Sequence, residues 1–152
     1  MTQHHSALRQ FWARHRFKLN GLVLILPFWF LYQSFDLQFP PALPKAQLGP
    51  YAVTAMPLSE DGPYAHHGEW VKDYYLQWCA GCVEKIRQGY LLVSETEPDL
   101  ASLSRGHSSL LHGNKHGLHV HARTPQHLKA GDKLWLIIED WQGQVYSHHW
   151  VL

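Results

Sequence analysis

Two cysteines, Cys79 and Cys82, are separated by two residues and follow a stretch of aromatic and β-branched residues, Trp70–Trp78. A CxxC pair has three common uses: a redox dithiol, part of a metal site, or a short-range disulfide. As a redox pair, Cys79 would be the nucleophile and would need a thiolate of low pKa. Outside the cytoplasm two lone cysteines tend to be oxidised to a disulfide. The spacing leaves all three uses open.

Histidine is the compositional outlier, with 13 in 152 residues. His119 and His121 stand two apart in an alternating segment, so on a strand they would point to one face, about 6 to 7 Å apart. Two imidazoles placed in this way can converge on one ion, and with thiolate they suit iron, copper or zinc. We therefore predict a metal site whose ligands come from two clusters: Cys79 and Cys82, and His112, His116, His119 and His121.

Two further histidine pairs are weaker candidates. His66-His67 is expected in a loop before the cysteine strand, and such a pair usually faces solvent. His148-His149 is expected on the last strand, where only one of the two can face a given side. The chain contains no HExxH, GxSxG or phosphate-loop motif, so a hydrolase has no support, and we expect an accessory or metal-binding subunit rather than an enzyme.

The segment that precedes these clusters is apolar. Residues 19–35 carry no charge, four of the 13 basic residues come before them, and all 12 acidic residues come after them. This asymmetry predicts a transmembrane helix over 19–35 with residues 1–18 as a cytoplasmic tail. A cleaved signal peptide and a buried core helix are the alternatives. The outer part has nine Lys/Arg against 12 Asp/Glu, which does not favour nucleic acid binding.

The remainder is expected to be mainly β. Residues 36–48 are a Pro-rich linker, and residues 49–152 form one domain in which alternation predicts several strands. Short strands with Gly/Pro turns favour an immunoglobulin-like β-sandwich. A thioredoxin-like α/β fold is the alternative, because Trp78 precedes the CxxC pair and a Thr124-Pro125 step follows. No closing helix is expected after the final hairpin. The strands are expected at 51–56, 70–78, 116–123, 134–141 and 144–152, with 83–93 a helix or a strand and 94–108 a polar loop.

Five short motifs follow one another along the chain: Gly49-Pro50-Tyr51, Trp70-Val71-Lys72-Asp73, Cys79 to Arg87, Gly113 to His116, and Leu134 to Gly143. Their order, which covers most of residues 45–152, resembles a group of small membrane-anchored periplasmic proteins. These are encoded beside PepSY-type inner-membrane reductases in Gram-negative siderophore-iron uptake operons. The resemblance implies a periplasmic domain that assists the reductive release of iron from a ferric siderophore, while a PepSY-type partner transfers the electrons.

Three hypotheses for function follow. The first is an inner-membrane-anchored periplasmic accessory protein of siderophore-iron uptake that binds metal or assists iron reduction through the Cys/His set. The second is a membrane-tethered thiol-disulfide oxidoreductase that uses Cys79 and Cys82. The third is a structural subunit of a membrane complex, in which Trp135, Trp141 and Trp150 provide contact or core residues.

Overall fold

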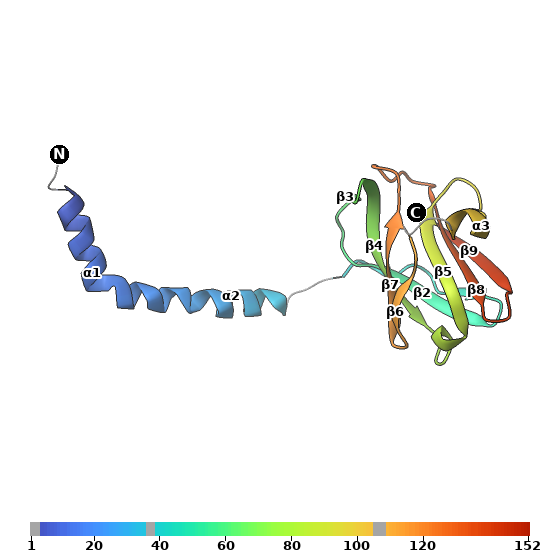
Figure 1. The fold of residues 1–152 in the computed structure, drawn as a ribbon, viewed down its shortest axis with the longest axis horizontal. Coiled ribbons are helices and arrows are strands. Elements are labelled where there is room, and N and C mark those ends of the chain that lie inside the picture. The colour runs from blue at the N-terminus through green and yellow to red at the C-terminus, as the bar shows by residue number, and fades with distance from the viewer. Residues whose placement is uncertain (1–3, 36–38, 105–108) are drawn as a thin grey trace. The chain divides into compact units, whose positions relative to one another are not determined.

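The computed structural model describes residues 4–35, 39–104 and 109–152. The chain divides into two units, residues 1–38 and 39–152, and each is considered by itself (Figure 1). Residues 1–3 of the expected tail, 36–38 of the expected linker, and 105–108 of the expected loop lie outside the described residues.

The first unit is helical, with α1 over His4–Val23 and α2 over Ile25–Ser34. The two helices are separated at Leu24, whose N–H donates to the Gly21 carbonyl three residues back at 3.2 Å. Pro27 explains the interruption, because it has no N–H for the Val23 carbonyl and its ring crowds that group. The segment 19–35, in which one transmembrane helix was expected, is therefore divided at Leu24. None of the helices among the described residues has both the length and the apolar character needed to cross a membrane.

The second unit is mainly β, as expected, and its described strands form one nine-stranded sheet (Figure 1). The order is β1-β2-β4-β7-β5-β8-β9, with β3 paired to β4 and β6 paired to β7. Neighbouring strands are antiparallel except β5 and β7. The strands are β1 Ala46–Leu48, β2 Tyr51–Pro57, β3 Tyr64–His66, β4 Glu69–Trp78, β5 Ile86–Val93, β6 His112–Asn114, β7 Gly117–Arg123, β8 Lys133–Asp140 and β9 Val145–Val151, with a 3-10 turn at Val83–Lys85 and the short helix α3 at Leu100–Leu103.

The sheet is nearly closed rather than divided into two separate sheets. One parallel pair, Leu92 with Arg123, joins β5 to β7 in the middle of the order. At its two ends β1 and β9 contact each other, and the Trp150 Nε1 donates to the Pro44 carbonyl at 2.7 Å. The expected immunoglobulin-like sandwich is corrected to this single curved sheet. The thioredoxin-like alternative is wrong, because the described strands are almost all antiparallel and α3, the only α-helix among the described residues of this unit, has four residues.

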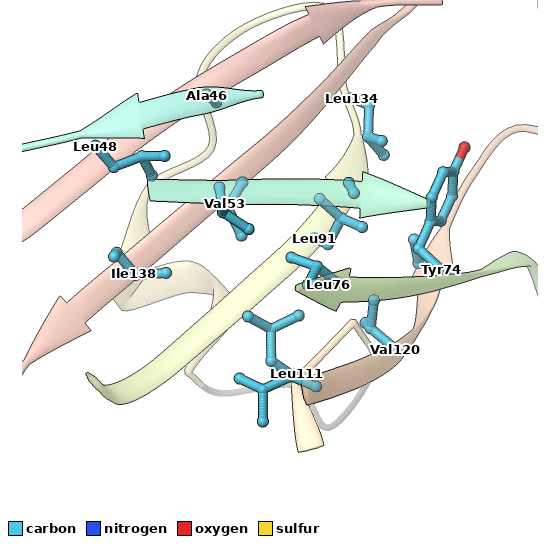
Figure 2. Close-up of a cluster of buried hydrophobic side chains, with 14 of the residues drawn as sticks. Ala46, Leu48, Val53, Tyr74, Leu76, Leu91, Leu111, Val120, Leu134 and Ile138 are labelled. Carbon is cyan, nitrogen blue, oxygen red and sulfur yellow. The ribbon is translucent and has the colours of Figure 1, made fainter. Parts of the chain in front are cut away.

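The core lies between the two halves of the sheet (Figure 2). Val53, Leu76 and Val120 enter it from β2, β4 and β7, while Leu91 and Ile138 enter it from β5 and β8, and none is more than 1% exposed. Burial also raises the pKa of Tyr74, beside them, to about 12. Each fully buried aliphatic side chain contributes roughly 1.5–3 kcal/mol of transfer free energy. The alternation expected for residues 116–123 is present, with Leu118, Val120 and Ala122 inward.

Two segments expected to be irregular contribute to this packing. Ala46 and Leu48 of β1 are buried in the core, although they fall in the expected linker. In the expected loop 94–108, Leu103 of α3 packs on Tyr90, Leu92 and Ile137 on the outer side of β5 and β8. This second cluster explains why β8 is buried on both faces rather than alternating.

Candidate functional site

The antiparallel pairing of β4 and β7 decides which side chains share the outer face. Tyr74 lies opposite Val120, and both are buried. The pairs on either side of it are Asp73 with His121 and Tyr75 with His119. Because side chains alternate along a strand, these two pairs point away from the core. The sequence prediction that His119 and His121 share one face is consistent with this register.

Strand β6 adds a third imidazole. His112 lies directly opposite His119 in the β6–β7 pair, and their ring centroids are 3.8 Å apart. The centroids of His112 and His121 are 5.9 Å apart, and those of His119 and His121 are 6.4 Å apart. Three of the four predicted histidine ligands therefore gather on one exposed surface.

Strand β3 supplies a fourth imidazole that the sequence assigned to a loop. His66 ends β3, and its ring centroid lies 4.9 Å from that of His121. The turn into β4 is made by His67 and Gly68, whose φ angles are +49° and +84°. Positive φ at both central residues is the geometry of a tight hairpin turn that matches strand twist. We call His66, His112, His119 and His121 the histidine face.

The Asp73 carboxylate, which also accepts a hydrogen bond from Tyr64, fixes the orientation of His121. The Asp73 Oδ1 lies 2.6 Å from the His121 Nδ1, and the Tyr64 hydroxyl donates to the same carboxylate at 3.0 Å. Because an ionised carboxylate can only accept, the proton on this side of the imidazole is on Nδ1. The Nε2 of neutral His121 therefore carries a free lone pair, as in a metal-ligating histidine held by a second-layer carboxylate.

His112 is held in the same tautomer by the main chain. Its Nδ1 lies 3.0 Å from the Leu110 carbonyl oxygen, which is an acceptor only. The lone pair of neutral His112 is then on Nε2, beside the ring of His119. Partial burial, followed by the nearby imidazoles of His112 and His121, lowers the pKa of His119, while Asp73 acts in the opposite direction. His119 is thus biased towards the neutral form that can bind a metal.

The fourth predicted ligand, His116, has a different position. It lies in the turn between β6 and β7, where its N–H donates to the Asn114 Oδ1 at 2.9 Å. Its carbonyl accepts a hydrogen bond from the Tyr75 hydroxyl, also at 2.9 Å. The main chain of His116 therefore positions Tyr75 on the face, while its exposed side chain lies at the turn.

The two cysteines form a disulfide, Cys79–Cys82, so this candidate pairing is present in the structure. Cys82 is 8% exposed and belongs to the core cluster, against which Cys79 packs. The Cys79 Sγ accepts a hydrogen bond from the Ala52 N–H at 3.2 Å. In this oxidised state neither sulfur is a thiolate, so neither offers a metal the ligand that the sequence prediction assumed.

The disulfide and the histidine face do not converge. Cys79 follows Tyr75, which faces His119, by four residues, or roughly 13 Å along an extended chain. Cys82 also points into the core, whereas the imidazoles point outward. Within the part of the chain that the structure describes, no group of three or more His, Cys, Asp or Glu residues is already arranged to hold a metal ion.

The remaining histidine pair lies on β9. His148 packs against Trp150, with ring centroids 4.8 Å apart, and His149 packs against Trp135, with centroids 4.6 Å apart. Partial burial and the adjacent His149 lower the pKa of His148. His148 is half-buried and His149 is exposed, and their ring centroids lie 6.3 Å apart.

A family model decides the relationship of the chain to other proteins, since it matches residues 11–152. The chain belongs to the family described as uncharacterised conserved protein UCP029505. Neither the curated proteins nor the solved structures contain a significant match to it.

Sequence reasoning missed two residues of the site, Tyr64 and Asp73, and named His66 only as a weaker candidate in a loop. Asp73 carried a signal, because Asp73 and Tyr75 alternate with the buried side chains Tyr74 and Leu76. Tyr64 carried no signal, and the position of both Tyr64 and His66 depends on a hairpin between β3 and β4 that pairs Tyr64 with Val71.

Proposed function

We propose that this chain is a membrane-tethered, extracytoplasmic metal-binding protein that captures a divalent transition-metal ion on its histidine face. The single observation that carries the proposal is the pair His112–His119, whose rings are 3.8 Å apart and exposed on adjacent strands. The Nε2 of His112 is free to bind, because its Nδ1 is engaged by the Leu110 carbonyl. Imidazole without thiolate suits copper(II), zinc and iron(II).

His121 is the third ligand in this proposal. Its ring is close to both His112 and His119, and the Asp73 carboxylate fixes its tautomer. Rotation of side chains on the exposed face would bring three Nε2 atoms together, leaving the remaining positions for water or for ligands carried by the metal. Asp73 would also raise the basicity of His121 through their hydrogen bond.

The sequence supports a cellular location and a partner for this activity. The cations before residue 19 and the uncharged segment 19–35 support an inner-membrane tether with the N-terminus in the cytoplasm. The resemblance to small periplasmic proteins of siderophore-iron operons supports a role beside a PepSY-type reductase. In that role the face accepts iron(II) once the ferric chelate has been reduced, because the reduced ion prefers imidazole more than the ferric ion does.

Metal binding is tested on the full-length protein in detergent. Copper(II) is the sharpest probe, because N-donor sites generally bind it more tightly than the other divalent first-row ions. Replacing both His112 and His119 with alanine is expected to weaken copper(II) affinity at least 100-fold, and to remove the nitrogen couplings from its electron paramagnetic resonance spectrum.

The double variant His148→Ala with His149→Ala is the matched control, since it removes the same number of imidazoles from β9. It is expected to change the affinity less than threefold. Equal losses in the two double variants, or an unaltered affinity in the first, would overturn the proposal.

The iron role is tested separately, in cells of the source organism that lack this chain and are supplied with one ferric siderophore as sole iron source. Wild-type protein is expected to restore growth, while the His112/His119 double variant is not. Restoration by both would separate metal binding from iron uptake and would contradict the second part of the proposal.

A further inference from the structure

The disulfide closes a tight turn that begins where β4 ends. The Cys82 N–H donates to the Cys79 carbonyl, three residues back, at 3.0 Å. Gly81, the third residue of the turn, has a φ angle of +72°, a conformation that favours glycine at this position. The hydrogen bond does not involve the sulfur atoms, so it keeps the two cysteines close together when the S–S bond is open.

The two cysteines of the turn differ in their access to solvent. Cys82 is 8% exposed and belongs to the core cluster, whereas Cys79 is partly buried and packs against that cluster. Ala80 and Gly81, which lie between them, are exposed. A methyl group added at Gly81 would meet no atom within 4 Å. A partner molecule can therefore approach the turn from solvent, and Cys79 is the cysteine that it reaches first.

A main-chain donor distinguishes Cys79 further. The Cys79 N–H extends the pairing of β2 and β4 by donating to the Ala52 carbonyl at 2.9 Å. The Cys79 carbonyl is engaged in the turn, and the Ala52 N–H donates to the Cys79 Sγ at 3.2 Å. A hydrogen bond to an ionised acceptor is roughly twice as strong as one to a neutral acceptor, so this N–H stabilises a thiolate more than a disulfide sulfur. The apolar surroundings of Cys82 favour a neutral thiol instead.

We propose that Cys79 and Cys82 form a thiol-disulfide exchange site for a partner that carries two thiols. One partner thiolate attacks the Cys79 Sγ, the bond between the two cysteine sulfurs breaks, and the Cys82 sulfur takes up a proton. The partner's second thiolate then attacks the partner sulfur of the mixed disulfide, and Cys79 leaves as a thiolate that accepts the Ala52 N–H.

The exchange is complete without a further reactant. Two electrons pass from the partner to this chain, so the partner gains a disulfide and the pair becomes a Cys82 thiol and a Cys79 thiolate. Of the two protons of the partner dithiol, one is on Cys82 and the other is released to water. This activity goes beyond metal binding and uses a site separate from the histidine face.

The first test uses the oxidised full-length protein in detergent, with a chelator present to exclude metal ions. Dithiothreitol is the dithiol probe, and rapid alkylation followed by mass spectrometry measures the reduced fraction. A disulfide that only supports the fold is protected by it and reacts faster after unfolding in urea. We expect the folded protein to react at least as fast as the unfolded chain. A rate more than about tenfold slower in the folded state would overturn the proposal.

The matched variants Cys82→Ser and Cys79→Ser test which sulfur is attacked, with glutathione disulfide as the probe. The Cys79 thiol that remains in the first variant is expected to form the mixed disulfide at least about tenfold faster than the Cys82 thiol in the second. In reduced wild-type protein, a limiting amount of iodoacetamide is expected to label Cys79 first, so the result does not depend on the folding of either variant. Equal reactivity, or faster reaction of Cys82, would overturn the proposal.

The exchange site and the metal site are tested separately. The variant that replaces both His112 and His119 with alanine should react with dithiothreitol at the wild-type rate, because its disulfide is unchanged. A slower reaction of this variant, in a chain that still folds, would contradict a separate exchange site. Loss of copper(II) binding with normal exchange, or the reverse, would identify which of the two proposals has failed.

Discussion

Strands β7 and β9 each carry two histidines, yet their surroundings differ. His119 and His121 alternate on β7 and meet His112 and His66 from two other strands. His148 and His149 are consecutive on β9, where the first is half-buried and the second exposed, and each packs against a tryptophan. The rings within the two pairs are equally far apart, 6.3 Å on β9 and 6.4 Å on β7, so what distinguishes the pairs is their neighbours: further imidazoles around β7 and tryptophans around β9.

The largest effect expected from this contrast is on stability at β9. Trp150→Ala removes a 5%-exposed side chain and its hydrogen bond to Pro44, and should destabilise the fold by about 3–5 kcal/mol. Trp141→Ala, at a 65%-exposed position, is the matched control, with an expected loss below about 1 kcal/mol. Urea unfolding measures both, and similar losses would show that Trp150 does not lock the sheet.

The disulfide should affect stability and leave the histidine face unchanged. Replacing Cys79 and Cys82 together with serine is expected to cost about 2 kcal/mol, the value for closing so short a loop. Copper(II) affinity should stay within twofold, since the sulfurs lie apart from the imidazoles. A large loss of affinity in a variant that still folds would restore the single Cys/His site that the sequence predicted.

Asp73→Asn tests the support of His121 by its carboxylate. The asparagine amide is nearly isosteric but lacks the charge, so copper(II) affinity should fall about tenfold. The unfolding free energy should change by less than about 1 kcal/mol, because the pair is at the surface. Isothermal titration measures the copper(II) affinity, and urea unfolding measures the free energy of unfolding. An unchanged affinity would show that Asp73 does not support the site.

The smallest expected effect is a pH dependence shared by the two histidine pairs. The pKa values of His119 and His148 are lowered from 6.5 in the folded chain, mainly by burial. The unfolded state then binds protons first, so stability is complete above pH 6.5 and declines as the pH falls below it. His119→Gln and His148→Gln should each reduce the difference between the urea midpoints at pH 7.5 and 5.5. An unaltered difference between the two urea midpoints would contradict the lowered pKa values of His119 and His148.

The sequence predicted what local patterns determine. Alternation in residues 116–123 gave β7, its inward residues and the shared face of His119 and His121. Two of the three tryptophans expected as contact or core residues are buried, Trp135 and Trp150, while Trp141 is exposed. Pro27 gives the interruption between α1 and α2 a local cause, although the sequence was interpreted as one helix over 19–35.

What the sequence left undetermined depends on strand pairing. Asp73 meets His121 across 48 residues, and His66 comes near the same ring only through the β3–β4 hairpin. No local pattern specifies which strands become neighbours, so the carboxylate was not expected in the site. The expectation of one Cys/His site was wrong for the same reason. Without the strands that pair with β4, the sequence does not show which of its residues face the core and which face outward.

The hydrogen bond between Trp150 and Pro44 has a consequence for how the domain folds. It joins residues 106 positions apart, so the first and last parts of the β domain contact each other in the folded state. Such distant pairing makes folding slow, because the intervening chain must be ordered before the contact forms. During synthesis or export, β1 would remain without its β9 neighbour until the last strand emerged. The exposed edge of β2 and β1 would be the segment that chaperones need to protect in that interval.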